Sequence, residues 1–210
     1  MPTRTVSNLN MYEIQKSNYI ASEVASYRST RHNSIGSDYS YLSNKSDDYY
    51  KPLSSGIIGF TAELVAAVIP CSGYNAKHPK TRYLPELLPF INKVCKKCRV
   101  DLRTMLFALI YAKRFGEALE RQGTSARGEY GTCHRIFLAS LLLAKKAQDD
   151  DAVYFDNNQL AECTDGIWSV KDIEMMEKAL ASTIGFDFIV DEETIKGFVE
   201  EHRSELCWFR

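Results

Sequence analysis

The sequence predicts an all-α protein, and the distribution of its apolar residues supports this fold class in three ways. The segment from Ile136 to Ala144 contains one polar residue, Ser140, so a helix here would be apolar on every side. Such a helix belongs at the centre of a bundle, with other helices packed around it. The segments before and after it repeat apolar residues at the i, i+3, i+4 spacing of amphipathic helices. Finally, no segment alternates apolar and polar residues as a strand does.

The central helix has recognisable ends. Thr132 is expected to be its N-cap, and Arg135 and Lys145 stand at the two ends of its apolar part. That part is about half as long as the roughly 20 apolar residues that cross a bilayer. We therefore expect neither a membrane span nor a membrane partner.

Three helices are expected on the N-terminal side of the central one. Thr61 can cap a short first helix, which Pro70 ends and whose polar face holds almost only Glu63. This helix is therefore buried on the bundle or covered by a partner. A second helix starts near Pro85 or Pro89. Its expected inward positions are Leu87, Leu88, Ile91, Val94, Cys95 and Cys98.

The third of these helices runs from Leu102 to about Leu119, and Asp101 is its expected N-cap. Its expected inward positions are Leu102, Met105, Leu106, Leu109, Ile110 and Phe115. A loop over 123–131 that contains three glycines connects this helix to the central one.

The C-terminal part of the chain begins with a polar connection at 149–151 and a short helical segment near 159–164. Ser169 and Asp172 have the spacing of a capping box, which predicts a helix that ends near Ile184. Residues 185–188 are expected to leave this helix in an extended conformation. One last amphipathic helix is expected from Asp191 to Leu206.

Residues 1–55 differ from the rest of the chain, because Ser, Asn, Tyr and Asp dominate and aliphatic residues are sparse. Such a composition buries too little apolar surface to offset the entropy of ordering, so a disordered tail is expected. No secretory signal is recognisable, and the six cysteines form no evident disulfide framework. An intracellular protein is expected, in the nucleus, the cytoplasm or both.

The sequence lacks the motifs that would indicate catalysis. There is no Gly-rich phosphate loop, no His-Glu-x-x-His and no paired-carboxylate constellation. Cys95 and Cys98 form a C-x-x-C without the second pair that zinc needs, and they fit the buried face of a helix. Cys133 and His134 point about 100° apart on a helix, so they cannot act together as nucleophile and base. The sequence therefore predicts a binding protein with no catalytic residue, no metal and no cofactor.

Two charged residues lie next to apolar faces. Lys146 follows the apolar run of the central helix by one turn, so it projects from an apolar row. Glu177 lies at the edge of the inward face of the 170–184 helix and has no basic residue four positions further on. One interpretation is a functional Lys146–Glu177 pair. The other is a solvated edge, with Lys146 complementing the helix C-terminus or pairing with Asp149 or Asp150.

With these charges in place, the chain from about residue 60 to 190 resembles a cyclin box, most closely that of the fungal Pcl-type cyclins. The resembling segments are Leu-Ile-Tyr-Ala-Lys-Arg-Phe at 109–115, His-Arg-Ile-Phe-Leu-Ala-Ser-Leu-Leu-Leu-Ala-Lys-Lys at 134–146 and Ala-Glu-Cys-Thr-Asp-Gly at 161–166, with Asp150, Asn157, Met176 and Glu177. The resemblance implies a single five-helix cyclin box with a pre-box helix over 56–190, followed by a C-terminal helix over 191–210.

The resemblance also implies a function. In cyclins, a Lys and a Glu at the positions of Lys146 and Glu177 grip the backbone around the mobile C-helix of a cyclin-dependent kinase. The apolar residues that pack against that helix match Leu143, Ala147, Phe186 and Phe188. We therefore expect a regulatory subunit that binds and activates a cyclin-dependent kinase, related to the kinase of the phosphate-response pathway, and directs its choice of protein substrates.

Two other functions are compatible with a cyclin fold. A transcription factor would need a basic stripe for DNA, and neither the net charge of −1 nor the dispersed lysines provide one, so no nucleic-acid partner is expected. A scaffold would bind a kinase without activating it.

The sequence departs from many cyclins at three places, and the first is Leu160, where a Trp is common. Lys113 stands where an Asp usually forms an internal ion pair with the first helix of the box. The Met-Arg-x-x-Leu-x-x-Trp pattern that docks substrates in many cell-cycle cyclins is also missing, so that docking site is not expected here.

Overall fold

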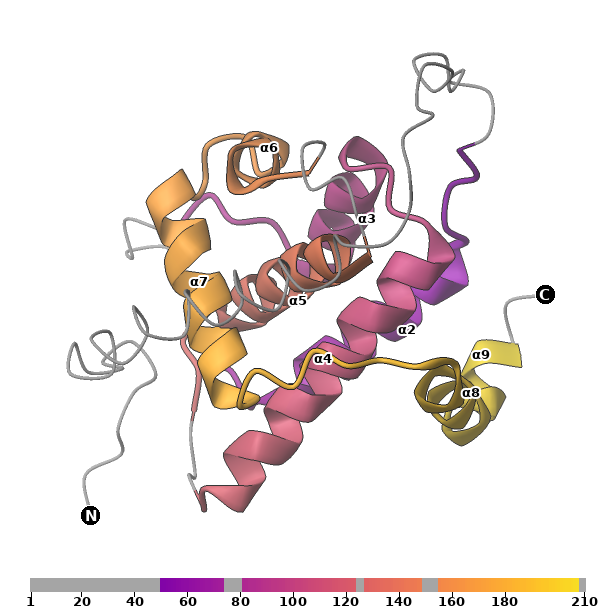
Figure 1. Cartoon of the computed structure of the whole chain (residues 1–210). Helices are drawn as coiled ribbons and strands as arrows, with labels where there is room; N and C mark the ends of the chain where they lie inside the picture. Colours follow the sequence, from indigo (N-terminus) through magenta and orange to yellow (C-terminus); the bar gives the residue numbers. More distant parts are fainter. Residues whose placement is uncertain (1–49, 74–80, 124–126, 149–154, 208–210) are drawn as a thin grey trace, which may run out of the picture. The chain divides into compact units, whose positions relative to one another are not determined.

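The computed structural model describes residues 50–73, 81–123, 127–148 and 155–207, which form a bundle of α-helices (Figure 1). The helices are α2 (Ser55–Val68), α3 (Leu87–Lys97), α4 (Leu102–Arg121), α5 (Thr132–Gln148), α6 (Asn157–Cys163), α7 (Val170–Thr183), α8 (Glu192–Glu201) and α9 (Arg203–Cys207). These described ranges contain no strand, only an isolated β-bridge between Cys71 and Gly128. The predicted all-α fold class is confirmed. The predicted tail over residues 1–49 and the predicted connection at 149–151 lie outside the described residues.

Helix α5 lies at the centre of the bundle, as its apolar sequence predicts. Every residue from Ile136 to Ala144 is buried, and α2, α3, α4, α6 and α7 all pack against this helix. Figure 1 shows α5 between α3, α4, α6 and α7. Because transfer of one Leu side chain out of water is worth about 2 kcal/mol, the buried Leu138, Leu141 and Leu142 of this helix contribute substantially to the stability of the fold.

Short polar residues fix where several helices begin. Asp101 caps α4, since its Oδ1 accepts from Thr104 N at 2.7 Å. Ser169 and Asp172 form the predicted capping box of α7, with both reciprocal hydrogen bonds present. A second capping box, Asp156 with Gln159, starts α6 two residues before the predicted position. At α5 the predicted N-cap, Thr132, is instead the first helical residue.

The prediction that Thr61 caps the first helix is wrong. Helix α2 begins six residues earlier, at Ser55, where the Ser54 side chain accepts from Ile57 N at 3.3 Å. Thr61 is fully buried inside the helix and donates its hydroxyl to Ile57 O at 2.7 Å. The helix therefore includes Gly56 and Gly59, which precede the predicted start.

Two residues predicted to face inward are exposed. Leu88 and Leu102 each have 51% of their surface exposed, and both lie in the first turn of a helix. Phe90 is buried in α3 instead, because its ring packs edge-on against Phe137 and Trp168, at centroid distances of 6.4 and 5.6 Å. An aromatic ring buries more apolar area than a Leu side chain, so the inward face of α3 is turned toward Phe90.

The single helix predicted from Asp191 to Leu206 is also wrong, because the chain breaks it into α8 and α9. His202 is the C-cap of α8, and its ring lies 5.2 Å from that of Phe60 on α2 and 4.6 Å from that of Phe198. The break lets α9 turn toward α2, which it contacts.

His134 attaches the first turn of α5 to the segment before α3. Its Nε2 lies 2.9 Å from Pro85 O, and because a carbonyl oxygen only accepts, Nε2 carries the proton of the neutral ring. The ring is 2% exposed and packs 5.0 Å from the ring of Phe90. Burial lowers the pKa of His134 to about 4, although the hydrogen bond to Pro85 opposes this shift.

The burial of α5 predicts a large difference between two identical substitutions. Leu142→Ala removes a side chain with no exposed surface and should lower the free energy of unfolding by about 3 kcal/mol. Leu88→Ala, at a position that is 51% exposed, should lower it by less than about 0.5 kcal/mol. Urea unfolding followed by far-ultraviolet circular dichroism measures both, and equal effects would contradict a central α5.

The buried neutral ring of His134 predicts an acid-sensitive stability. The pKa is about 4 in the folded chain and 6.5 for an unperturbed His, so the unfolded chain binds more protons between these values. The free energy of unfolding should therefore fall as pH decreases from about 6.5 to about 4, by about 3 kcal/mol over the window. In His134→Gln, whose amide retains a donor for Pro85 O, this part of the pH dependence should vanish. Unfolding curves at half-unit pH steps test it, and parallel profiles for the two proteins would refute it.

Candidate functional site

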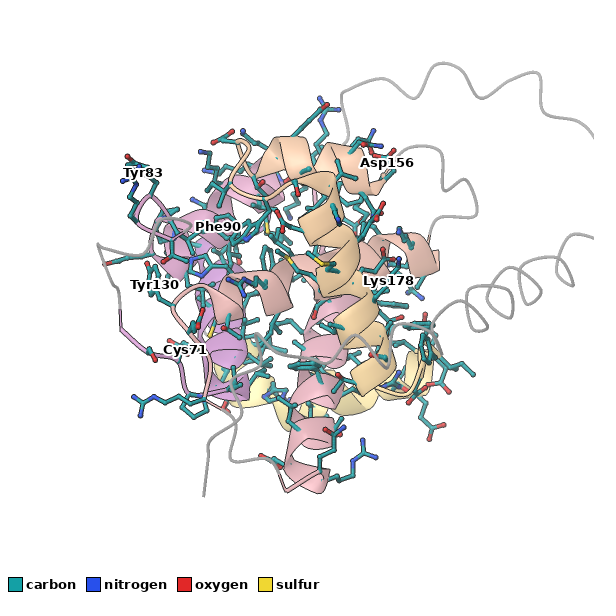
Figure 2. All side chains as sticks on the ribbon, turned by 90° about the vertical axis from the view of Figure 1, so that its left-hand side faces the viewer. Cys71, Tyr83, Phe90, Tyr130, Asp156 and Lys178 are labelled. Atoms are coloured by element: carbon teal, nitrogen blue, oxygen red, sulfur yellow. The ribbon has the colours of Figure 1, made fainter. Side chains whose placement is uncertain are left out.

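Lys146, Asn157 and Glu177 form a hydrogen-bonded group where α5, α6 and α7 meet. Lys146 Nζ donates to Asn157 Oδ1 at 2.8 Å and to Glu177 Oε1 at 2.7 Å. Asn157 Nδ2 donates to Glu177 Oε2 at 3.2 Å. Lys146 and Glu177, which sequence reasoning singled out, therefore lie side by side, and Asn157 bridges them. Their sequence neighbours Asp156 and Lys178, labelled in Figure 2, lie on the same side of the bundle in that view.

Each member of this group is placed by a helix with a well-defined end. Lys146 stands in the last turn of α5, where a cation interacts favourably with the helix C-terminus. Asn157 is the first residue of α6, directly after its N-cap Asp156. Hydrogen bonds from Gln159 and Asn158 hold the pKa of the Asp156 carboxyl below its usual value, so this cap stays ionised. Glu177 lies at the middle of α7, on the side that packs toward α5 and α6.

The Lys146–Glu177 ion pair is half-buried. The side chains are 28% and 17% exposed, respectively. An ammonium carries three donors and a carboxylate about four acceptor positions. Within the described part of the chain, Lys146 uses two donors and Glu177 uses two acceptor positions. Both groups can therefore form further hydrogen bonds with a molecule that docks over them. Asp149 and Asp150, the other predicted partners of Lys146, lie outside the described residues.

The segment after α7 is fixed by a helix-terminating motif. Gly185 N donates to Ser182 O at 3.1 Å, and Phe186 N donates to Ala181 O at 2.9 Å, which is the Schellman pattern. This motif needs a left-handed residue, and Gly185 has a φ of 67°. Phe186 also has a positive φ, 60°, which costs free energy for a bulky residue. The chain therefore turns sharply away from α7, and the prediction of an extended conformation over residues 185–188 is wrong for Gly185 and Phe186.

Two residues of α4 hold the backbone of this segment. Tyr111 Oη donates to Phe188 O at 2.9 Å. Arg114 donates from Nη1 to Asp187 O and from Nη2 to Ile189 O, both at 2.8 Å. Three consecutive carbonyl groups are thus bound from one helix, which sets the direction in which this segment leaves the bundle.

The apolar residues predicted for the site differ in exposure. Phe186 and Phe188 are half-buried, and their rings meet edge-on at a centroid distance of 6.0 Å. Phe188 also packs 6.2 Å from the ring of Tyr111, and the neighbouring Ile189 is 69% exposed. Ala147 is exposed, whereas Leu143 is only 7% exposed and belongs mainly to the core.

Sequence reasoning named Asn157, Tyr111 and Arg114 only as parts of the family resemblance and gave them no role in this region. Asn157 lies within a capping box, between Asp156 and Gln159, and directly after the N-cap it takes the first position of the helix. No pattern in the sequence around Asn157 indicates its contact with two charged residues on other helices. Tyr111 and Arg114 lie three apart on α4, so they share one face, and the Arg among buried neighbours was the available signal.

The described residues contain no cluster of three or more His, Cys, Asp or Glu side chains arranged to hold a metal ion. Among these residues, no helix has the length and apolarity that crossing a bilayer requires.

Comparison with known proteins identifies the fold. The cyclin N-terminal domain matches residues 60–189 of the chain. Three curated relatives come from Saccharomyces cerevisiae. PHO85 cyclin-1 is 33% identical over 151 residues, PHO85 cyclin-2 is 25% identical over 145 and PHO85 cyclin-9 is 26% identical over 137. These alignments cover 69%, 69% and 65% of this chain and 52%, 46% and 43% of the relatives. The chain thus spans about half the length of the curated relatives it matches. No solved structure matches.

A helical bundle around one apolar helix, matched over residues 60–189 by the cyclin N-terminal domain, defines a cyclin box. The chain belongs to the cyclin family. Within that family it is similar to the PHO85 cyclins, which agrees with the Pcl-type resemblance of its sequence.

Lys113, where many cyclins carry an Asp, forms a different ion pair. It pairs with Glu201 at the end of α8 rather than with the first helix of the box. The attraction lowers the pKa of the Glu201 carboxyl. The positive charge of Lys113, opposite in sign to that of the usual Asp, is therefore paired with a residue of the C-terminal helix α8.

The half-buried pair predicts a measurable interaction free energy. In a double-mutant cycle, Lys146→Ala and Glu177→Ala should show a coupling of about 1–2 kcal/mol, because the pair is shielded from water and hydrogen-bonded. The control pair is Arg203 with Glu200, whose side chains are 69% and 73% exposed. Its coupling should be below about 0.5 kcal/mol. Urea unfolding of the four variants of each cycle gives both values, and equal couplings would exclude a special role for burial.

Proposed function

We propose that this chain is a regulatory subunit that binds and activates a cyclin-dependent protein kinase. The observation that carries the proposal is the Lys146–Glu177 pair, which the fold brings together at 2.7 Å and leaves partly exposed. Membership of the cyclin family supports the same function. The chain would contribute no catalytic group, and the kinase would carry out phosphoryl transfer.

The proposed contact uses the hydrogen-bond donor and acceptor positions of the pair that the chain itself leaves unused. Lys146 has a donor left for a backbone carbonyl of the partner, and Glu177 has acceptor positions left for backbone N–H groups. Hydrogen bonds from ionised groups are about twice as strong as neutral ones, so two of them would fix the end of a partner helix in position. Asn157 keeps both side chains oriented before the partner arrives.

Apolar side chains would cover the rest of the partner helix. Phe186 and Phe188 follow directly after α7, the helix that carries Glu177, and Ile189 adds an exposed aliphatic side chain. The distance along α7 from Glu177 to its end is about 9 Å, or less than two helical turns. Ala147 adjoins Lys146, so a partner that contacts the charged pair would also contact this small residue.

The activating effect follows from holding the mobile C-helix of the kinase inward. In that position the Lys–Glu ion pair of the kinase and its activation loop reach the arrangement that phosphoryl transfer requires. A subunit that binds only this arrangement shifts the kinase toward it by its differential affinity.

The relatives carry the name PHO85 cyclins, and we propose a PHO85-type kinase as the partner and protein substrates of that kinase as the targets. The protein would act inside the cell, in the nucleus, the cytoplasm or both. The free thiols of the described cysteines support a reducing compartment.

The proposal predicts the effect of removing the charged pair. The variant Lys146→Ala with Glu177→Ala should reduce activation of a PHO85-type kinase at least about tenfold, because two charge-assisted hydrogen bonds to the partner are lost. A reconstituted kinase assay with purified subunits, at a fixed kinase concentration and varied cyclin concentration, measures this.

The control variant, Arg203→Ala with Glu200→Ala, removes an equal number of charges from α8 and α9 and should activate normally. Circular dichroism establishes that both variants are folded. A folded Lys146→Ala, Glu177→Ala variant that activates like the wild type would show that the proposed contact is wrong. Wild-type chain that binds the kinase without raising its activity would instead identify a scaffold.

A further inference from the structure

Two segments that are distant in the sequence are held together beside the first turn of α5. Cys71 follows α2, and Cys133, 62 positions later, is the second residue of α5. Ser72 N donates to Gly128 O at 2.8 Å, and Gly128 N donates to Pro70 O at 2.9 Å. This isolated β-bridge fixes the position of Cys71 against the loop that leads into α5.

The close approach depends on a glycine. A Cβ at residue 128 would lie 2.8 Å from Thr132 Cβ and 3.0 Å from Cys71 Sγ, which is closer than such atoms pack. With glycine there, Cys71 Sγ and Cys133 Sγ come to 3.0 Å from each other. A covalent S–S bond is about 2.05 Å long, so a movement of about 1 Å separates this contact from a bond.

The two thiols differ in reactivity. Cys71, labelled in Figure 2, is half-buried, whereas Cys133 is 8% exposed. The hydrogen bond from Cys133 lowers the pKa of Cys71 to about 7, although burial opposes it. The same hydrogen bond, together with burial, raises the pKa of Cys133. As a thiol, Cys71 also donates weakly to Ile69 O at 3.4 Å. The lowered pKa raises the thiolate fraction of Cys71 at neutral pH above that of an ordinary thiol.

We propose that Cys71 and Cys133 form a peroxide-sensitive thiol pair that closes to an intramolecular disulfide. The Cys71 thiolate attacks one oxygen of hydrogen peroxide, the O–O bond breaks and hydroxide leaves, so that Cys71 becomes a sulfenic acid. Cys133 Sγ then attacks the Cys71 sulfur, loses its proton and displaces hydroxide, which is released as water. Overall, two thiols are oxidised and one hydrogen peroxide is reduced, which yields one disulfide and two water molecules. A dithiol reductant restores both thiols by thiol–disulfide exchange and is itself oxidised to its disulfide.

The other described cysteines differ from Cys71 and Cys133 in burial, in pKa or in how the backbone holds them. Cys95 is 2% exposed, and burial raises its pKa to about 12, so it is protected and mostly protonated. Cys98 and Cys163 also share a hydrogen bond, which lowers the pKa of Cys163 and raises that of Cys98. Only for Cys71 and Cys133, among the described residues, does a backbone bridge lock the two segments together around a 3.0 Å contact. We therefore assign the first oxidation to this pair.

The disulfide would tie the end of α2 to the start of α5 and close a long loop. Such a link restricts the unfolded chain, so the oxidised protein should be the more stable form. Lys146 lies in the last turn of α5, and the thiol pair at the first, so this inference is independent of the proposed kinase contact.

The experiment uses the full reduced chain and hydrogen peroxide at one equivalent, followed by alkylation and mass spectrometry. We expect a mass decrease of about 2 Da and the loss of two alkylatable thiols, with one tryptic peptide that links Cys71 to Cys133. The melting temperature should rise by roughly 5–10 °C and return after reduction.

Two variants identify the roles of the thiols. Cys133→Ser should stop at the sulfenic acid of Cys71, which dimedone traps, and its melting temperature should not rise. The matched control Cys163→Ser should form the same Cys71–Cys133 disulfide as the wild type. A first linkage between Cys98 and Cys163, a linkage to Cys207, disulfides between two chains only, or no loss of thiols would each overturn the proposal. The wild-type peptide map decides this even if a variant does not fold.

Discussion

The burial of the apolar part of α5, from Ile136 to Ala144, is the constraint on which the rest of the structure depends. A helix that is apolar on every side is stable only when other helices cover all of it, and five helices do so here. The same helix also sets the positions of distant functional groups. Its first turn carries Cys133 and His134 and its last turn carries Lys146, so a rigid rod of about 20 Å separates the thiol pair from the charged group.

Sequence reasoning predicts the parts of this fold that depend on neighbouring residues. Asp101 and Ser169 cap their helices as predicted, because capping is a contact between residues three apart. The start of α2 was missed because glycines weaken a helix in isolation, whereas packing of Ile58 and Val65 against the bundle stabilises it. The exposure of Leu88 was missed for a related reason. Periodicity defines a face, but only the surrounding helices decide how that face is turned.

The candidate site also contains residues that could be recognised from the sequence and residues that could not. Lys146 and Glu177 are 31 positions apart, and each was recognised from its own helix, where it stands beside apolar residues. Glu177 also lacks a basic residue four positions further on. Asn157 was recognised only as a part of the family resemblance, because its partners lie on two other helices. The hydrogen bonds from Tyr111 and Arg114 reach residues more than 70 positions away. No pattern in a single sequence contains such contacts, which arise only when α4 and the end of α7 are packed together.

The hydrogen bonds from Arg114 and Tyr111 affect which positions of the segment after α7 can vary in sequence. Both residues bind main-chain oxygens, which every amino acid possesses. The path of the segment thus depends little on the side chain at 189, which is 69% exposed, whereas the Asp187 carboxylate adds an ion pair with Arg114 at 3.3 Å. Substitution of Ile189 can therefore change the chemistry of the surface displayed after α7, while the main chain that carries it keeps its course.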